Sequence, residues 1–211
     1  MKPEVAIIGA GYVGLPLAIR FAQKGRTTLT VDVDPDKVEA INQGRSYIHE
    51  IPSSDIGSAV GNDWLQATTD FSAISHAKAI LVCVPTPLTP NREPDLRYVL
   101  QTAESIGKHL QEGQLVSLES TTYPGTTSGK FKEVLEATSD LRAGEDFHLA
   151  FSPEREDPGN PDSRVDRVPK IVGGLTETCQ QTAADLYATV SGNVVKVGSC
   201  EVAEAAKLLE N

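Results

Sequence analysis

A glycine-rich turn near the N-terminus constrains the fold of this chain more than any other feature. Gly9, Gly11 and Gly14 form a Gly-x-Gly-x-x-Gly pattern between an apolar run at residues 5–8 and a segment of helical period. In a strand-turn-helix unit the first glycine allows a tight turn, the second lets the backbone approach a pyrophosphate, and the third lets helix and strand pack closely. The unpaired N–H groups at the start of the helix favour phosphate. The turn therefore predicts a dinucleotide-binding βαβ unit.

An acidic residue at the end of the next apolar run predicts the contact to the ribose. Asp32 lies about 20 residues beyond the turn, where an acid accepts hydrogen bonds from the ribose hydroxyls. Its carboxylate would repel the 2′-phosphate of NADP, so NAD is the predicted cofactor, although Lys37 in the following helix offsets part of this repulsion. Tyr12 and Val13, inside the turn, belong to the same predicted site. Asp34 competes for the ribose role, but its place before a proline suits a helix cap better.

Short apolar runs rich in β-branched residues alternate with longer segments of helical period along the chain, which is typical of βαβ units around a buried parallel sheet. The expected fold is α/β, a Rossmann-type doubly wound, mostly parallel sheet with helices on both faces. The predicted strands are residues 5–8, 28–33, 79–84, 115–118, 147–151, 170–172 and 194–197. The predicted helices are residues 13–24, 34–44, 95–110, 125–137, 176–189 and 201–211. The segment 45–69 fits this alternation least well.

Charge and cysteine content exclude several classes of function. The formal net charge of -10 provides no positive field to attract nucleic acid or an anionic membrane. No apolar run reaches the roughly 20 residues of a membrane span, so a cytoplasmic protein is expected. The three cysteines form no Cys-x-x-Cys pair and are expected to be free thiols. The four histidines show no ligand spacing, so no metal site is predicted. Tyr47 and Trp64 are expected to be packing residues.

Several ordered motifs resemble the UDP-glucose/GDP-mannose dehydrogenase family, with the best agreement in its UDP-N-acetylglucosamine 6-dehydrogenase branch. The motifs are Gly11-Tyr-Val-Gly-Leu-Pro16, Cys83-Val-Pro-Thr-Pro87, Arg92-Glu-Pro-Asp95, Glu119-Ser-Thr-Thr-Tyr-Pro-Gly125, Ser152-Pro-Glu-Arg-Glu-Asp-Pro-Gly159 and Ala206-Lys-Leu-Leu-Glu-Asn211. Family enzymes oxidise the sugar C6 alcohol to a carboxylate in two NAD-dependent steps and hold the intermediate on a cysteine. The resemblance thus implies NAD as cofactor, a UDP-sugar as substrate and a homo-oligomeric parent protein.

The resemblance also assigns roles to individual residues. It implies cofactor contacts from Val84, Thr86, Pro87 and Thr121, placement of the catalytic water by Thr122, thioester hydrolysis assisted by Glu154, and oxyanion stabilisation by Lys207 with Asn211 beside it. Residues 154–169 are expected to form a site loop.

Judged on the residues alone, these assignments have simpler alternatives. The two threonines suit an ordinary strand exit, and Glu154 suits a solvated loop charge. Lys207 suits an ion pair with Glu204 or Glu210 on the surface of a helix.

The sequence departs from the family pattern in one respect that concerns catalysis. No Gly-rich cysteine motif of the family's kind occurs in it, and its final segment has a helical pattern without a cap. We therefore expect residues 1–198 to form the NAD-binding domain and residues 199–211 to begin a truncated linker helix. Such a chain would bind NAD without full turnover. The alternatives are a stand-alone dinucleotide-binding module, a UDP-glucose, UDP-N-acetylmannosamine or GDP-mannose dehydrogenase, and a Rossmann enzyme acting on a hydroxy acid.

Overall fold

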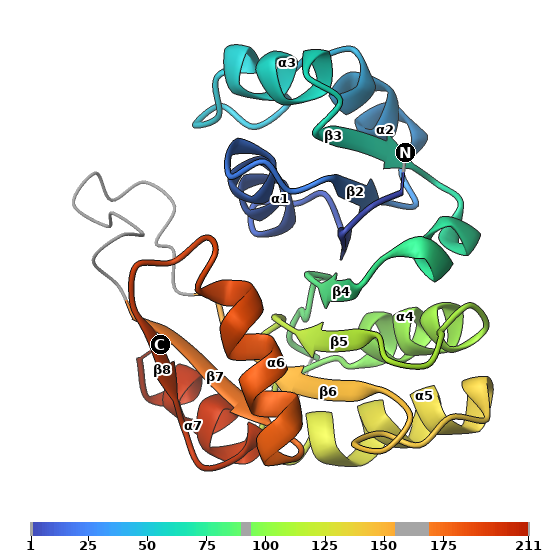
Figure 1. Ribbon diagram of the computed structural model, residues 1–211, viewed down its shortest axis with the longest axis vertical. Helices are drawn as coiled ribbons and strands as arrows, with labels where there is room; N and C mark the ends of the chain where they lie inside the picture. The colour runs from blue at the N-terminus through green and yellow to red at the C-terminus, as the bar shows by residue number, and fades with distance from the viewer. Residues whose placement is uncertain (1, 90–93, 155–168, 211) are drawn as a thin grey trace.

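The strands of this protein form one sheet in the order β3-β2-β1-β4-β5-β6-β7-β8. The computed structural model describes residues 2–89, 94–154 and 169–210. In Figure 1, β3 lies at the top, β4, β5 and β6 follow below it, and β7 lies to the left of β6. Their bounds are β1 (Val5–Ile8), β2 (Thr28–Val31), β3 (Leu65–Thr68), β4 (Ala79–Val82), β5 (Leu115–Leu118), β6 (His148–Phe151), β7 (Lys170–Gly174) and β8 (Val194–Lys196). The predicted α/β class is confirmed.

The pairing of the strands determines where a site can form. From β3 to β6 every pairing is parallel, so the carboxyl ends of these six strands share one edge of the sheet. β7 runs antiparallel to β6, with Phe151 opposite Gly173, and β8 is parallel to β7. The prediction of a mostly parallel sheet is therefore confirmed. The reversal also brings the start of β7, at Lys170, next to the chain that leaves β6.

Two apolar layers bury the two faces of the sheet. Along β1, Val5 and Ile7 belong to one buried cluster, whereas Ala6 and Ile8 belong to the other. The first cluster packs under α1 (Gly14–Gln23), α2 (Pro35–Asn42), α3 (Ser53–Gly61) and α6 (Glu177–Tyr187). The second packs under η1 (Phe71–His76), α4 (Arg97–Gly107), η2 (Thr127–Phe131), α5 (Lys132–Ser139) and α7 (Cys200–Glu210). In Figure 1, α1 and α6 lie to the left of α4 and α5.

Some predicted bounds are wrong, for identifiable reasons. Strands β2 and β4 end two residues earlier than predicted, and β2 stops because Asp32 turns its carboxylate to neighbouring backbone N–H groups. The poorly fitting segment 45–69 contains α3 and β3. β3 is an edge strand with the sequence Leu-Gln-Ala-Thr, so it lacks the apolar run of a buried strand. The helix predicted at residues 125–137 begins instead with η2, a π-helical segment in which Gly129 has non-helical backbone angles, and continues as α5.

No helix in the described ranges is long and apolar enough to cross a membrane. Nearly all of the site loop expected at residues 154–169 lies outside the described residues, as does Asn211. The division into residues 1–198 and 199–211 stays a prediction, although α7 begins near that boundary and packs against β6 and β7.

Candidate cofactor and active site

The glycine-rich turn has the geometry that the sequence predicts. Gly9 has a φ of 97°, and a Cβ atom there would lie 2.6 Å from the carbonyl oxygen of Cys83. A Cβ atom at Gly14 would lie only 1.8 Å from the carbonyl oxygen of Gly9. At Gly11, in contrast, a Cβ atom would meet nothing within 4 Å, so open space adjoins the backbone. Within the described ranges, the N–H groups of residues 11–13 have no hydrogen-bond partner and are available to an anion.

Asp32 joins this turn to the end of β2. One of its carboxylate oxygens accepts the N–H of Ala10 at 2.6 Å, and the other accepts the N–H of Asp34 at 2.9 Å. The ammonium nitrogen of Lys37 lies 3.8 Å from the first oxygen. Each carboxylate oxygen accepts more than one hydrogen bond, so Asp32 keeps capacity for ribose hydroxyls. Asp34 caps α2 through the N–H of Asp36 at 3.0 Å, as predicted.

Two pockets meet at Asp32. The larger, of about 610 Å³, has apolar walls that include Val33, Phe71 and Tyr98. The smaller, of about 400 Å³, runs along residues 10–13 of the turn. Both pockets are lined by Gly9, Asp32, Lys37, Val84 and Pro85, and the larger one also by Pro87. This arrangement fits a dinucleotide. The apolar slot suits the base, the carboxylate of Asp32 suits the ribose, and the N–H groups of the turn suit the phosphates.

Two predicted cofactor residues do not line these pockets. Thr86 lies between Pro85 and Pro87, beside the pockets without forming their walls. Thr121 follows Ser120, whose hydroxyl donates to the carbonyl oxygen of Val84 at 2.7 Å. Both threonines are thus near the carboxyl end of β4, and their contact with a cofactor stays a prediction.

A buried charged cluster lies at the carboxyl ends of β5 and β6. The ammonium nitrogen of Lys170 lies 2.6 Å from a carboxylate oxygen of Glu119 and 3.3 Å from one of Glu154. Glu119 also accepts the hydroxyl of Tyr187, and the Lys170 ammonium stands 5.0 Å from the centre of the Tyr187 ring. The antiparallel reversal at β7 creates this arrangement, since it places Lys170 beside the residues that follow β6. The predicted site residue Glu154 is therefore tied to a fixed cation.

The charges of this cluster act on one another in both directions: burial raises the pKa of Glu119, the Lys170 ammonium opposes this rise, and the Glu154 carboxylate adds to it. Burial opposes the charge on Lys170, but the carboxylates of Glu119 and Glu154 outweigh it and raise the pKa of the ammonium. Lys170 is therefore a cation inside the protein. Burial, together with the charge of Glu119, raises the pKa of the neighbouring Cys83 thiol well above its usual value. Because Cys83 also lines the smaller pocket, the charged cluster adjoins the cofactor site.

None of the three cysteines has the properties of a nucleophile. All three are free and buried, as expected. Cys83 lies just after β4 and, given its raised pKa, stays a neutral thiol. Burial and the charge of Glu204 raise the pKa of Cys200 to about 12. Cys179 is fully buried in α6, where the hydroxyl of Thr176 contacts its sulfur at 3.1 Å.

The carboxylate of Glu204 fastens α7 to the loop before η2. It accepts the N–H groups of Gly125 at 2.7 Å and Thr127 at 2.9 Å, and the hydroxyl of Thr127 at 2.7 Å. The hydroxyl of Thr122 is also in contact with it, at 3.3 Å. Thr122 is fully buried, so its hydroxyl is committed to Glu204 in this structure. The alternative in which Lys207 pairs with Glu204 is wrong; within the described ranges Lys207 has no ion pair.

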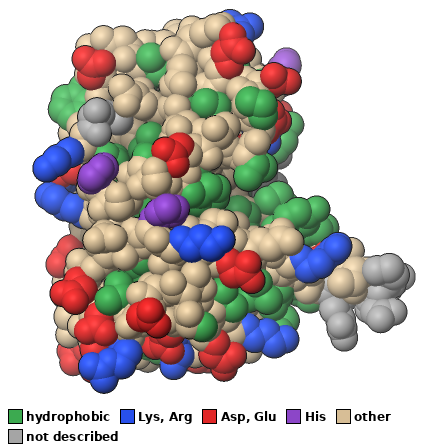
Figure 2. Space-filling view, turned by 90° about the vertical axis from the view of Figure 1, so that its right-hand side faces the viewer, with side chains coloured by type: hydrophobic (Ala, Val, Ile, Leu, Met, Phe, Trp, Pro, Cys, Tyr) green, Lys and Arg blue, Asp and Glu red, His purple; other side chains and the backbone are tan. Residues whose placement is uncertain are grey.

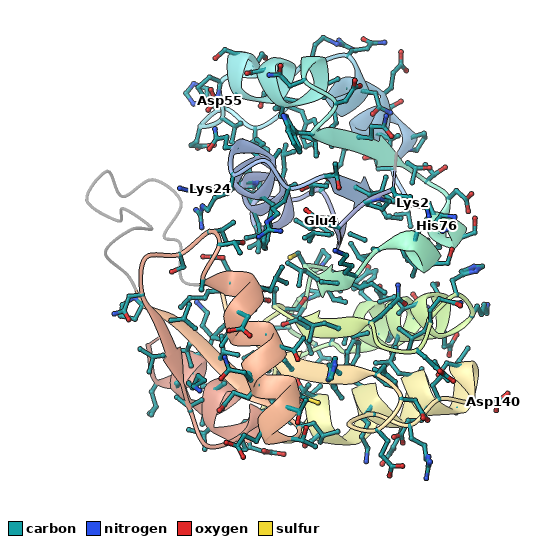
Figure 3. The ribbon with its side chains drawn as sticks, viewed as in Figure 1. Lys2, Glu4, Lys24, Asp55, His76 and Asp140 are labelled. Carbon is teal, nitrogen blue, oxygen red and sulfur yellow. The ribbon has the colours of Figure 1, made fainter. Side chains whose placement is uncertain are left out.

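A different set of charged side chains lies at the other end of the parallel strands, where these strands begin. Glu4, just before β1, pairs with Arg26 at 3.4 Å and with Lys78 at 3.6 Å, which precede β2 and β4. His76, at the end of η1, also precedes β4 and lies on the right-hand side of Figure 3.

The face in Figure 2 mixes acidic and basic side chains and carries no continuous basic patch of the kind that binds nucleic acid.

Comparison with known proteins agrees with this geometry. Residues 3–191 match the family described as UDP-glucose/GDP-mannose dehydrogenase family, NAD binding domain. The chain belongs to this family. NAD is therefore the cofactor of this domain.

Named relatives show how wide this dehydrogenase family is. The chain is 37% identical over 209 residues to UDP-N-acetyl-D-glucosamine 6-dehydrogenase of Pseudomonas aeruginosa, covering 99% of this chain and 49% of the relative. It is 38% identical over 215 residues to UDP-N-acetyl-D-mannosamine dehydrogenase of Yersinia pestis, covering 98% and 50%. The chain thus spans about half the length of the curated relatives it matches.

Solved structures of the dehydrogenase family share the fold closely. NDP-N-acetyl-D-galactosaminuronic acid dehydrogenase from Methanosarcina mazei Go1 has a TM-score of 0.91 and 34% identity, covering 99% of this chain and 46% of that one. A ternary complex of GDP-mannose dehydrogenase from Pseudomonas aeruginosa also has a TM-score of 0.91, at 27% identity, covering 99% and 49%.

Four residues of this dehydrogenase domain were not identified as site residues from the sequence. They are Tyr47, whose hydroxyl donates to the carbonyl oxygen of Ala10, and Glu119, Lys170 and Glu204. Tyr47 was expected only to pack. A charged residue directly after or at the start of a buried strand, as at Glu119 and Lys170, is the signal that could have found two of them.

Proposed function

We propose that this chain is the NAD-binding part of a nucleotide-sugar 6-dehydrogenase that oxidises the C6 alcohol of a UDP-sugar to the uronate. The observation that carries the proposal is the Glu154 carboxylate, held by Lys170 beside the cofactor pocket. A carboxylate fixed next to the dinucleotide pocket is suited to activate water for hydrolysis of an acyl intermediate. NAD, when bound, supplies the acceptor for hydride from C6.

Other residues are proposed to act around the reacting carbon. Lys207 supplies an ammonium for developing oxyanion charge, and Asn211, which lies outside the described residues, is proposed to add an amide. Thr122 places the attacking water, for which its hydroxyl must exchange its contact with Glu204. The loop between β5 and η2 and the helix α7, which carry these residues, are joined by the hydrogen bonds of Glu204.

UDP-N-acetylglucosamine is the proposed sugar. Similarity to the Pseudomonas aeruginosa enzyme, at 37%, and to a Salmonella typhi enzyme of the same name, at 33%, supports this choice. UDP-N-acetylmannosamine is the second candidate, because identity to the Yersinia pestis enzyme is 38%.

The proposal includes a limit on what this chain does alone. The pKa values of Cys83 and Cys200 are raised by burial, and Cys179 is enclosed in α6, so a covalent step on any of the three is unfavourable. We therefore expect the chain by itself to act as a dinucleotide-binding module.

A turnover assay tests this function. The chain is incubated with NAD and, separately, UDP-N-acetylglucosamine, UDP-N-acetylmannosamine, UDP-glucose and GDP-mannose, and NADH is followed by absorbance. We expect no sustained NADH formation from the chain alone. A second assay adds a separately produced C-terminal half of the Pseudomonas aeruginosa relative, and UDP-N-acetylglucosamine should then give the fastest turnover. Two NADH per sugar from the chain alone would refute the stated limit.

Cofactor preference gives a separate prediction. Asp32→Ala removes the carboxylate that repels a 2′-phosphate, so the preference for NAD over NADP should fall by at least about tenfold. Calorimetric titration of both cofactors measures the ratio. Asp36→Ala, on the exposed start of α2, is the matched control and should leave the ratio unchanged. An unaltered ratio in Asp32→Ala would exclude this carboxylate as the selective group.

A further inference from the structure

Both backbone polar groups of Ala10 are held by side chains from different parts of the chain. The N–H donates to Asp32, after β2, at 2.6 Å. The carbonyl oxygen accepts the hydroxyl of Tyr47, from the connection between α2 and α3, also at 2.6 Å. Ala10 itself is fully buried and lies at the centre of the glycine-rich turn. The turn is thus fixed from two sides before any ligand enters.

The segment that carries Tyr47 is itself well anchored. Ile48 is buried in the apolar core under α1 and α3. The hydroxyl of Ser46 donates to the carbonyl oxygen of Ile48 at 2.9 Å, and the N–H of Ser46 donates to the hydroxyl of Ser53 at 3.0 Å. Tyr47 therefore reaches the turn from a rigid base, although its own side chain is partly exposed.

The planarity of the peptide bond transmits this contact to the next residue. In a trans peptide the carbonyl and the following N–H point in opposite directions. By holding the Ala10 carbonyl, Tyr47 also fixes the direction of the Gly11 N–H, which points away from the tyrosine. Among the described residues that N–H has no hydrogen-bond partner, and Gly11 and Tyr47 both line the smaller pocket.

We propose that Tyr47 is a positioning residue for NAD, which orients the peptide between Ala10 and Gly11 so that its N–H faces the pyrophosphate. The contact orders the turn in advance, so less conformational freedom is lost when the phosphates bind. Burial, and the nearby carboxylates of Asp32 and Asp34, raise the pKa of Tyr47, so that its hydroxyl stays a donor at neutral pH. The inference rests on NAD binding at this turn, and failure of the unaltered chain to bind NAD would overturn both.

Tyr47→Phe removes only the hydroxyl and tests the proposal. Its dissociation constant for NAD should rise about two- to tenfold, the loss expected for one hydrogen bond. The affinity of the variant for ADP-ribose, which contains the pyrophosphate, should fall to the same extent. Adenosine, which lacks phosphate, should bind as to the unaltered chain, as measured by NMR shift titration. Unchanged NAD affinity, or an equal loss for adenosine, would overturn the proposal.

A second variant separates positioning from general loss of stability. Thr176→Val removes a hydroxyl that caps α6, where it accepts the N–H of Cys179 at 3.2 Å, remote from the glycine-rich turn. It should lower the thermal midpoint of unfolding without altering NAD affinity. If Thr176→Val lowered the affinity for NAD as much as Tyr47→Phe, the effect of Tyr47 would be one of stability, and the positioning role would be wrong.

Discussion

Lys170→Met should lower the free energy of unfolding by about 3–5 kcal/mol, because it leaves the buried carboxylate of Glu119 without its cation. The side chain of Glu119 is 0% exposed and that of Lys170 only 10%, so water cannot replace the lost partner. Urea unfolding followed by circular dichroism measures the change. The double variant Glu119→Gln with Lys170→Met should recover part of the loss, since the fully buried charge of Glu119 is then removed together with its cation, whereas Glu154 keeps its charge.

Lys78→Met is the matched control for this prediction. Lys78 also pairs with a glutamate, Glu4, at 3.6 Å, but its side chain is 81% exposed. Solvent screens such a pair, so we expect a loss of less than about 1 kcal/mol. Equal losses in Lys78→Met and Lys170→Met would show that burial does not govern the strength of the Lys170 cluster.

Gly14→Ala should weaken NAD binding by about tenfold to a hundredfold, because the added methyl group must displace the carbonyl of Gly9. The separation of 1.8 Å is far below van der Waals contact, and the carbonyl oxygen that the new Cβ atom would meet belongs to the backbone of the turn. Relief of the clash therefore moves the N–H groups that receive the phosphates. Calorimetric titration with NAD measures the effect.

Gly61→Ala provides the control for this second prediction. Gly61 ends α3, and a Cβ atom there would meet nothing within 4 Å. This variant should bind NAD as the unaltered chain does. If Gly14→Ala kept full affinity, the close packing of helix and strand at this glycine would not be required for the cofactor site.

The sequence predicts those features that depend on neighbouring residues. The turn from Gly9 to Gly14 is one continuous segment, and the cap at Asp34 needs only the residues that follow it. The limits of β2 were missed because they depend on Asp32 bonding to Ala10, 22 residues earlier. α3 and β3 were missed because short, polar segments at a sheet edge lack a clear apolar period.

The charged cluster could not be predicted because it depends on the path of the chain. Lys170 and Glu119 are 51 residues apart, and only the reversal of β7 brings them together. The partners of Glu204 could not be predicted for the same reason, because they are distant in the sequence. Helical spacing predicts a pair with Lys207, but the fold offers Glu204 two backbone N–H groups in an enclosed site. The spacing of residues along a helix carries no information about hydrogen-bond donors that a distant loop offers to the same carboxylate.

The attachment of Glu204 has a mechanical consequence for the molecule. This one carboxylate of α7 accepts four hydrogen bonds, two from the loop before η2 and two from Thr127, the first residue of η2. A rotation or sliding of α7 must therefore either drag this loop with it or break all four contacts together. Because Thr122 is one of these donors, a displacement of α7 would also act on the loop that leaves β5, at the carboxyl edge of the sheet where the cofactor pockets lie.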